Sequence, residues 1–362
     1  MLPENYPGIY FNHENVCSFC LDYQNIGRTQ GLKEKPKLNL ERIFAENKNK
    51  ADYDCLVCFS GGKDSTYLLY LLTKVYRLRV LAYTCDTGFL SEVAHNNIKN
   101  TVEKLNVEHI FLSPPSSIYK KIYSYILSRP NQGCQGIICG ICFSILRDTA
   151  TRLATVMHIP FIALGFVGSG LFPNNSPLGG ILRNDIFHNI YSHAFNEEEK
   201  RYILGLYRYQ LPMSKMIPTS LTPFLIKILK RCPHKLSRFV TKRYPRILLA
   251  LEESEYNEEK ISKEVVSLGL IKPGNEGPEV TNCLLNYLMI YIDTKNLGYN
   301  PYVASFSNLV RTGMAKREMW IAVFEKWLEE VKKDTYANEE IGLVLEKLNL
   351  TKEDLYFSKN RK

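Results

Sequence analysis

The sequence predicts an α/β protein built on an open parallel sheet, with a mostly helical C-terminal region. Four short apolar runs of strand length alternate with helix-like segments in the first half of the chain. These runs are DCLVCF, LRVLAYTCD, VEHIFLSP and IPFIALGF, at residues 54–59, 78–86, 107–114 and 159–166. Strands that alternate with helices form βαβ units, and helices then cover both faces of a parallel sheet.

The segments between these strands have the apolar spacing of helices. They are STYLLYLLTKVY, NNIKNTVEKLN and CGICFSILRDTATRLATVMH, at residues 65–76, 96–106 and 139–158. Two further helical segments, TNCLLNYLMIYIDTKNLGY and REMWIAVFEKWLEEVKKD, lie in the last quarter of the chain. We therefore expect a core that contains the sheet, followed by a helical region.

Composition divides the 362 residues into four parts. They are an N-terminal segment with a CxxC pair (1–50), the α/β core (51–170), a basic helical insertion (171–275) and a C-terminal helical region (276–362). The formal charge of +9 is concentrated in the insertion, since residues 201–250 contain no Asp or Glu. Such a segment is typical of a solvated helix face; the alternative is a surface that binds RNA or phospholipid.

The chain is expected to reside in the cytoplasm. Its first residues, MLPENYPGIYFNHEN, lack the apolar stretch of a signal peptide, and no apolar run reaches the length of about 18 residues typical of a membrane-spanning helix. The ten cysteines are then expected to be reduced rather than paired as disulfides.

A glycine-rich turn joins the first predicted strand to its helix. It consists of Ser60, Gly61, Gly62, Lys63, Asp64 and Ser65. Backbone N–H groups at such a turn and the dipole of the following helix bind phosphate, and glycine permits close backbone approach. Lys63 would add charge, and Asp64 could hold a magnesium ion. The alternative is a tight β–α turn whose glycines serve geometry only.

The run SGGKDS resembles the signature of the PP-loop ATP pyrophosphatases, over about residues 52–166. The resemblance implies a Rossmann-like sheet of the HUP type that binds ATP and Mg²⁺. It implies cleavage of ATP between the α- and β-phosphates, with AMP attached to a carbonyl-type oxygen that nitrogen or sulfur then replaces. Lys63 and Asp64 would be catalytic, and Asp86 and Gly165 would contact the nucleotide. The chain departs from several members of the family by continuing Gly165 as GFVGSG, without a His/Asp-rich motif.

Cysteine pairs with metal-ligand spacing form a second group of candidates. Cys17 and Cys20 form one CxxC, Cys139 and Cys142 form another, and Cys283 lies far downstream. Two such pairs can close a structural zinc site, whereas three Cys with an open position suit an iron–sulfur cluster. The alternative is that these thiols are buried core residues, as we expect for Cys55 and Cys58 in the first strand.

Two branches of the PP-loop family share these features. Cys139, Cys142 and Cys283 resemble the set that holds a [4Fe-4S] cluster in tRNA 2-thiolation enzymes. The segments PGIYFNHENVCSFCLDY and LGYNPYVASFSNLVRTGMAKRE are similar to the two ends of the N-acetyl-sugar amidotransferases of surface-polysaccharide synthesis. The earlier Cys pair of that second branch is absent here, which leaves its N-terminal zinc knuckle incomplete.

The best expectation is therefore an ATP-dependent, adenylate-forming amidotransferase. It would act on a small molecule such as a nucleotide sugar, with ammonia from a partner glutaminase, and could form a homodimer. Arg311 and Arg317 would bind an anionic substrate, unless they only begin a surface helix. The alternatives are a sulfur transferase that uses the same activation, with tRNA as one acceptor, and a nucleotide-binding regulatory protein without turnover.

Overall fold

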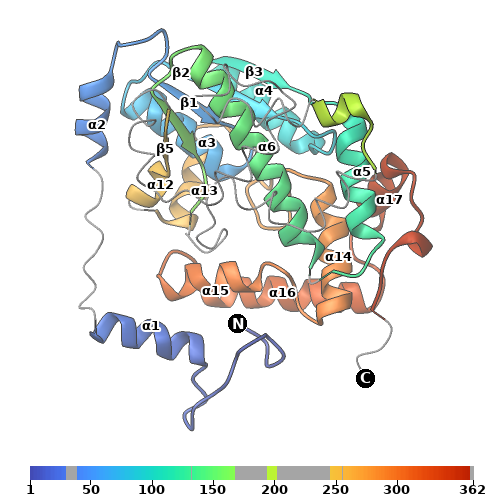
Figure 1. The fold of residues 1–362 in the computed structure, drawn as a ribbon. Coiled ribbons are helices and arrows are strands. Elements are labelled where there is room, and N and C mark those ends of the chain that lie inside the picture. Colours follow the sequence, from blue (N-terminus) through green and yellow to red (C-terminus); the bar gives the residue numbers. More distant parts are fainter. Residues whose placement is uncertain (30–38, 132, 168–193, 202–244, 255, 359–362) are drawn as a thin grey trace, which may run out of the picture.

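The computed structural model describes residues 1–29, 39–131, 133–167, 194–201, 245–254 and 256–358 (Figure 1). Five strands form one sheet in the spatial order β3-β2-β1-β4-β5, and every pair of neighbours is parallel. The strands are β1 (Cys55–Cys58), β2 (Val80–Cys85), β3 (Glu108–Leu112), β4 (Phe161–Leu164) and β5 (Arg246–Leu248). This sheet confirms the predicted α/β fold with an open parallel sheet.

Helices cover both faces of the sheet. The helices of the core are α2 (Leu40–Asn47), α3 (Lys63–Tyr70, extended by a π-helical turn, Leu71–Val75), α4 (Glu92–Leu105), α5 (Ser116–Leu127) and α6 (Cys134–Val156). Val57 and Ala82 belong to one apolar cluster with residues of α2, α3 and α4. Leu56 and Tyr83 belong to another with residues of α6. Because successive strand residues point to opposite faces, the whole of β1 is buried.

The fifth strand corrects one sequence-based prediction. Residues 246–248 fall in the predicted helical insertion, but the structure pairs Ile247 with Ile162 of β4. Pro245 precedes the strand and has no N–H to continue a helix, and the N–H of Arg246 donates to the Pro160 carbonyl at 2.9 Å. Among the described residues of the insertion, residues 197–201 are helical before this strand, and α12 (Ala250–Glu253) and α13 (Glu258–Ser267) follow it. Residues 202–244, with most of the basic segment, lie outside the described residues.

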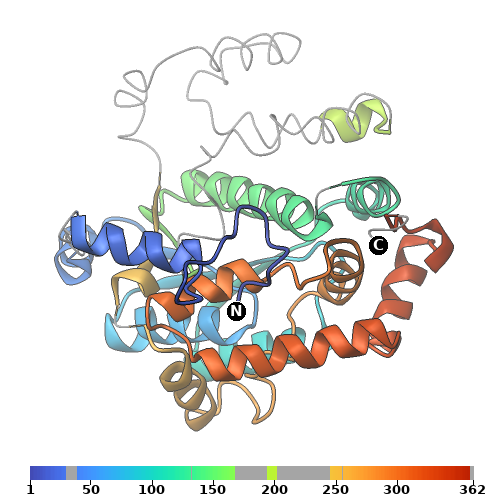
Figure 2. The same cartoon turned by 90° about the horizontal axis from the view of Figure 1, so that it is seen from below.

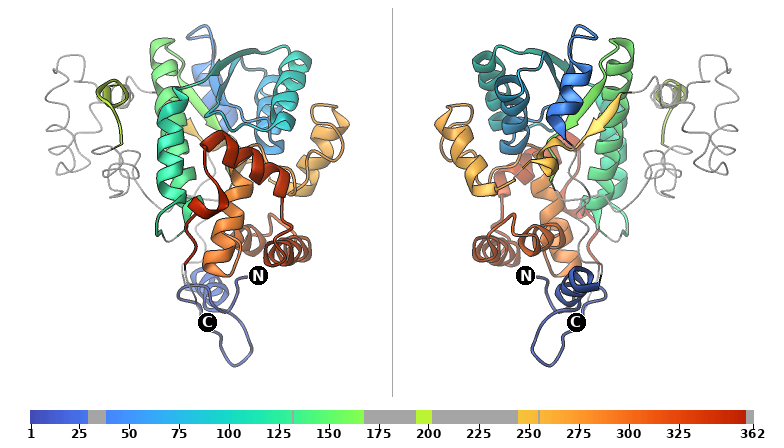
Figure 3. Two further views of the ribbon diagram at one scale, coloured as in Figure 1. Left: turned by 90° about the vertical axis from the view of Figure 1, so that its right-hand side faces the viewer. Right: turned by 90° about the vertical axis from the view of Figure 1, so that its left-hand side faces the viewer.

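The C-terminal region is helical, as predicted. Its helices are α14 (Leu285–Leu297), α15 (Val303–Arg311), α16 (Arg317–Lys332) and α17 (Asn338–Leu348), with a 3-10 turn at Lys352–Asp354. Figure 1 shows α14, α15 and α16 below the sheet, and Figure 3 shows the same orange and red helices from two further sides. Residues of α14, α16 and α17 share one apolar core with α5 and the first half of α6.

The N-terminal segment packs against this C-terminal region, so that sequence-distant parts of the chain meet. It contains α1 (Ser18–Thr29), and Figure 2 shows it beside α15. The Asn5 amide donates to the Leu297 carbonyl at 2.9 Å, and the rings of Tyr6 and Tyr299 lie 5.4 Å apart. Across the described ranges, no helix combines the length and the apolar character needed to span a bilayer.

Candidate nucleotide site

The glycine-rich turn lies between the end of β1 and the start of α3, as predicted. Gly61 has a φ of +77°, and a Cβ there would lie 2.6 Å from the carbonyl oxygen of Ala94 in α4. A Cβ at Gly62 would contact the side-chain amide of Asn282. The positive φ and the backbone neighbour therefore require glycine at position 61, whereas at position 62 the neighbouring atom belongs to a side chain.

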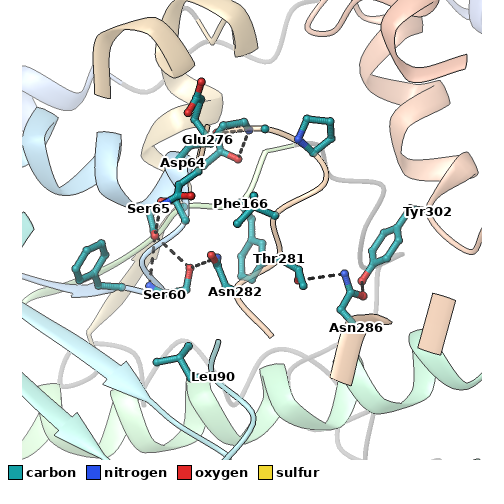
Figure 4. Close-up of a pocket in the computed structure, with 18 of the residues that line it drawn as sticks. Ser60, Asp64, Ser65, Leu90, Phe166, Glu276, Thr281, Asn282, Asn286 and Tyr302 are labelled. Atoms are coloured by element: carbon teal, nitrogen blue, oxygen red, sulfur yellow. Dashed lines mark hydrogen bonds and ion pairs between the residues drawn. The ribbon is translucent and has the colours of Figure 1, made fainter. Parts of the chain in front are cut away.

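Hydroxyl groups fix the shape of the turn (Figure 4). The Ser60 N–H donates to Ser65 Oγ at 3.3 Å, and the two hydroxyls lie 3.1 Å apart. Ser65 Oγ in turn donates to the Gly62 carbonyl at 3.1 Å. The Asn282 amide, which comes from a loop more than 200 residues away, donates to Ser60 Oγ at 3.1 Å. Hydrogen bonds within the turn, and one from the loop that contains Asn282, thus fix the conformation of the turn.

Lys63 lies between two carboxylates. Its Nζ is 3.1 and 3.0 Å from the two carboxylate oxygens of Asp64 and 3.4 Å from Oε1 of Glu258. Tyr256 donates its hydroxyl to Oδ1 of Asp64 at 3.0 Å, and the Trp320 indole donates to Oε2 of Glu258 at 3.1 Å. Burial acts to lower the pKa of Lys63, but the charges of the Asp64 and Glu258 carboxylates outweigh it and raise that pKa. Lys63 therefore stays cationic at neutral pH.

A cavity of about 420 Å³ opens in front of the turn, a size typical of small-ligand sites. It lies at the carboxyl ends of β1, β2 and β4, where open parallel sheets bind ligands. Its opposite wall comes from loop residues 275–278 and 280–282 and from the C-terminal helical region, which contributes Asn286, Tyr302, Phe306, Trp320 and Trp327. Among the described residues that line it, Lys63 is the only Lys, Arg or His. Asn286 joins the Thr281 hydroxyl to the Tyr302 hydroxyl across this wall (Figure 4).

The other two predicted nucleotide contacts lie in different positions. Gly165 lines the cavity, and a Cβ there would lie 2.9 Å from the Cα of Ser65, so β4 approaches the start of α3 closely. Asp86 is not among the lining residues, and its Oδ1 accepts the N–H groups of Gly88 at 2.8 Å and Leu90 at 3.3 Å. Asp86 therefore shapes the turn after β2.

Three predicted metal ligands, Cys139, Cys142 and Cys283, share one neighbourhood. Burial raises the pKa of the Cys283 thiol to about 12, and a charge on Cys139 would raise it as well. Burial likewise raises the pKa of Cys142, with contributions from Cys139, Cys283 and Cys85. Cys85 also lines the cavity, although no sequence pattern marks it as a site residue. Cys139 and Cys142 lie inside α6 and not at its start, because this helix begins at Cys134, before the predicted segment 139–158.

These thiols fit a metal in chemistry but not in arrangement. Three cysteines are a suitable donor set for an iron–sulfur cluster. Within the part of the chain that the structure describes, however, no three Cys, His, Asp or Glu side chains are arranged to hold a metal ion. The same result excludes, for these side-chain positions, a zinc site closed by Cys17, Cys20, Cys139 and Cys142. A magnesium ion held by one carboxylate and substrate phosphates needs no such group, and Asp64 is of the required type.

The N-terminal pair belongs to a different part of the molecule. Burial raises the pKa of Cys20, and a hydrogen bond with Cys17 raises it further, while Arg311 partly opposes both. Arg311 and Arg317 both act on the N-terminal amine of Met1, whose pKa is lowered by burial and by these charges. Neither arginine lines the cavity. The two residues predicted to bind an anionic substrate therefore lie beside the N-terminal CxxC segment.

The sequence did not reveal several residues of the site. Tyr256 and Glu258 stand in LEESEYNEEK, where the only clear signal is Asn257, whose side chain accepts from the Lys260 N–H and caps α13. Asn282 and Asn286 follow no motif. All four reach the cavity or the turn through contacts that join distant parts of the chain, and such contacts leave no local pattern.

Comparisons with known proteins give distant similarities. No family model matches the chain. The uncharacterized protein MJ1599 of Methanocaldococcus jannaschii is 25% identical over 147 residues, which are 40% of this chain and 50% of that protein. The chain thus spans about half the length of this curated relative.

Two solved structures are similar at low TM-scores. The U34-tRNA thiolase NcsA from Methanococcus maripaludis, solved with its [4Fe-4S] cluster, aligns with a TM-score of 0.33 and 13% identity over 91% of this chain and 89% of that one. The NH3-dependent NAD synthetase from Campylobacter jejuni aligns with a TM-score of 0.28 and 14% identity, over 61% of this chain and 93% of that one. At these values the assignment of function depends on the chain's own geometry.

Proposed function

We propose that the protein is an ATP-dependent enzyme that activates a carbonyl-type oxygen as an adenylate and releases pyrophosphate. The observation that carries this proposal is the glycine-rich turn with the cationic Lys63, which opens into a cavity at the carboxyl ends of three parallel strands. Backbone donors at the start of α3 and the Lys63 ammonium would bind phosphate oxygens. Mg²⁺, held by Asp64 together with the phosphates, would offset their charge.

The reaction balances in two steps. The acceptor's carbonyl oxygen attacks the α-phosphorus of ATP, and the bond from that phosphorus to the oxygen bridging to the β-phosphate breaks. Pyrophosphate leaves with the electron pair. A nucleophile then adds to the activated carbon, and AMP leaves with the original oxygen. In the first step Lys63 and the turn stabilise the charge that develops on the phosphates.

Two incoming groups are compatible with this activation. The resemblance of both chain ends to amidotransferases supports nitrogen, with ammonia supplied by a partner glutaminase and a sugar as acceptor. The position of the thiols supports sulfur as a second candidate, because Cys85 lines the cavity and Cys139, Cys142 and Cys283 lie near it. The choice between nitrogen and sulfur does not alter the role proposed for Lys63.

The activation step is tested by measuring AMP and pyrophosphate from ATP. Lys63→Ala should lower the rate by about 100-fold or more, the scale found when a group that stabilises transition-state charge is removed. Lys263→Ala is the matched control, since that lysine is 76% exposed in α13 and pairs with Glu259 on the surface. Unchanged pyrophosphate release in Lys63→Ala would contradict the proposal. ATP binding without pyrophosphate, under every acceptor tried, would favour the regulatory alternative.

The incoming group is tested by anaerobic purification with metal analysis. A brown protein whose visible absorption disappears in Cys139→Ala supports the sulfur route. A colourless protein without iron contradicts the sulfur route and leaves nitrogen as the incoming group. Cys55→Ala is a suitable control, because Cys55 is fully buried in β1 and belongs to the apolar cluster under α3.

A further inference from the structure

The two carboxylates that face Lys63 hold it unequally. Asp64 contacts Nζ through both oxygens, at 3.0 and 3.1 Å, whereas Glu258 contacts it through one oxygen at 3.4 Å. The three side chains are 18%, 30% and 12% exposed for Lys63, Asp64 and Glu258, so water screens the group only in part. Glu258 is therefore the more weakly bound of the two counter-ions.

A polyphosphate at the turn would compete with these carboxylates for Lys63. Lys63 lies at the wall of the cavity and is its only cation among the described residues. Phosphate oxygens and a carboxylate around one ammonium repel each other at short range. Glu258 has the single, longer contact, so it is the carboxylate that a phosphate oxygen displaces at the lower cost in free energy.

We propose that Glu258 is an exchangeable counter-ion of Lys63, which phosphate groups displace on binding and which takes Lys63 back when pyrophosphate leaves. This inference rests on the proposed function and adds a positioning residue that acts through Lys63. Glu258 lowers the affinity for polyphosphate and in return favours product release.

Trp320, on the opposite wall of the cavity, contacts Glu258 and should therefore sense its displacement from Lys63. Its indole N–H donates to Oε2 of Glu258, and its ring stacks on Phe306 with 3.4 Å between centroids. When Glu258 loses Lys63, its carboxylate gains charge density toward the indole N–H. The emission of Trp320 should therefore respond to phosphate at the turn. The chain has two tryptophans, so Trp327→Phe leaves Trp320 as the single reporter.

The test compares inorganic pyrophosphate binding by calorimetry in Glu258→Gln and in Glu259→Gln. Glutamine keeps the size of the side chain and an oxygen for Trp320 but removes the charge. We expect Glu258→Gln to bind pyrophosphate about tenfold more tightly, because one negative charge beside the phosphate site is lost. Glu259→Gln removes the same charge from the next residue of α13, but Glu259 pairs with Lys263 and Lys316 on the surface. It should change the affinity less than about twofold.

The direction of the change separates this role from a structural one. A residue needed only to hold Lys63 in place would weaken binding when replaced, and weaker or unchanged binding in Glu258→Gln overturns the inference. If Glu258→Gln does not fold, Glu258→Asp retracts the carboxylate by one methylene and should also tighten binding.

Fluorescence gives a second test. In the Trp327→Phe background, pyrophosphate should change the emission of Trp320, and Glu258→Gln should abolish that change. If Lys63→Ala leaves the affinity for pyrophosphate unaltered, the proposed function itself is contradicted, independently of the result for Glu258→Gln.

Discussion

Gly165 shows how one missing methyl group shapes the candidate site. It follows the last residue of β4 and lies against the first turn of α3, where an added Cβ would lie 2.9 Å from the Cα and 3.0 Å from the N of Ser65. Both of these are backbone atoms, so neither can move aside as a flexible side chain would. The residue therefore sets the distance between the sheet and the glycine-rich turn.

Gly165→Ala should destabilise the protein by about 1–3 kcal/mol, as overpacking of a close contact does, and should weaken ATP binding. Gly136→Ala is the matched control, because Gly136 is exposed in α6 and a Cβ there meets no atom of the described residues within 4 Å. That control should stabilise the protein by about 0.5–1 kcal/mol through helix propensity. Denaturant unfolding and calorimetric ATP titration measure both effects. Equal changes in unfolding free energy and in ATP affinity for the two variants would show that the close approach of Gly165 to Ser65 is unimportant.

At the scale of elements, the start of α6 depends on a residue of α14. Asp293 is 1% exposed, and its two oxygens accept the N–H groups of Cys134 at 2.7 Å and Gln135 at 2.9 Å. These are backbone donors in the first turn of α6 that no residue of the same helix can satisfy. Burial raises the pKa of Asp293, although these hydrogen bonds oppose that change. The carboxylate thus joins α14 to the helix that carries Cys139 and Cys142.

Asp293→Ala should cost about 2–4 kcal/mol in the free energy of unfolding, because two buried N–H groups lose their acceptor. Asp293→Asn keeps one acceptor oxygen and should cost less. Amide hydrogen exchange should rise at residues 134–137 in Asp293→Ala, while exchange in β1 should change little until global unfolding. A uniform rise across the sheet would show instead that the effect is not local to α6.

At the scale of the whole molecule, the C-terminal helices share a core with the α/β part of the chain. Ile341 and Val344 of α17 belong to the same apolar cluster as Ile122 of α5 and Ile138 of α6. Leu288 of α14 belongs to it as well. The wall of the cavity that carries Trp320 and Trp327 is therefore not an independently attached unit.

Ile341→Ala should cost about 2–5 kcal/mol and should lower the unfolding midpoint of the whole molecule in one transition, because Ile341 is fully buried in the shared core. Leu343→Ala, on the same helix, should stay within about 0.5 kcal/mol, because Leu343 is 51% exposed. Tryptophan fluorescence follows α16, and far-ultraviolet circular dichroism follows the whole chain. Two separated transitions in Ile341→Ala would show that the helical region unfolds by itself.

Local patterns were sufficient to predict much of the core. The runs around Leu56, Leu81 and Ile162 have strand length and apolar character, and each forms a buried parallel strand. The turn at Gly61 is flanked by a strand and a helix, which fixes its place at the carboxyl edge of the sheet. Residues 246–248 were missed, because a strand of three residues is defined by its pairing with β4 more than by its own sequence.

The sequence by itself determined the α/β class, the glycine-rich turn and the helical C-terminal region, because strand length, helical spacing and glycine content are properties of neighbouring residues. Only the tertiary structure decided which side chains surround that turn. Tyr256 and Glu258 reach Lys63 and Asp64 across more than 190 residues, and Arg311 lies beside Cys20 and away from the cavity. Such contacts arise when helices and loops pack on a formed sheet, and no local sequence pattern encodes them.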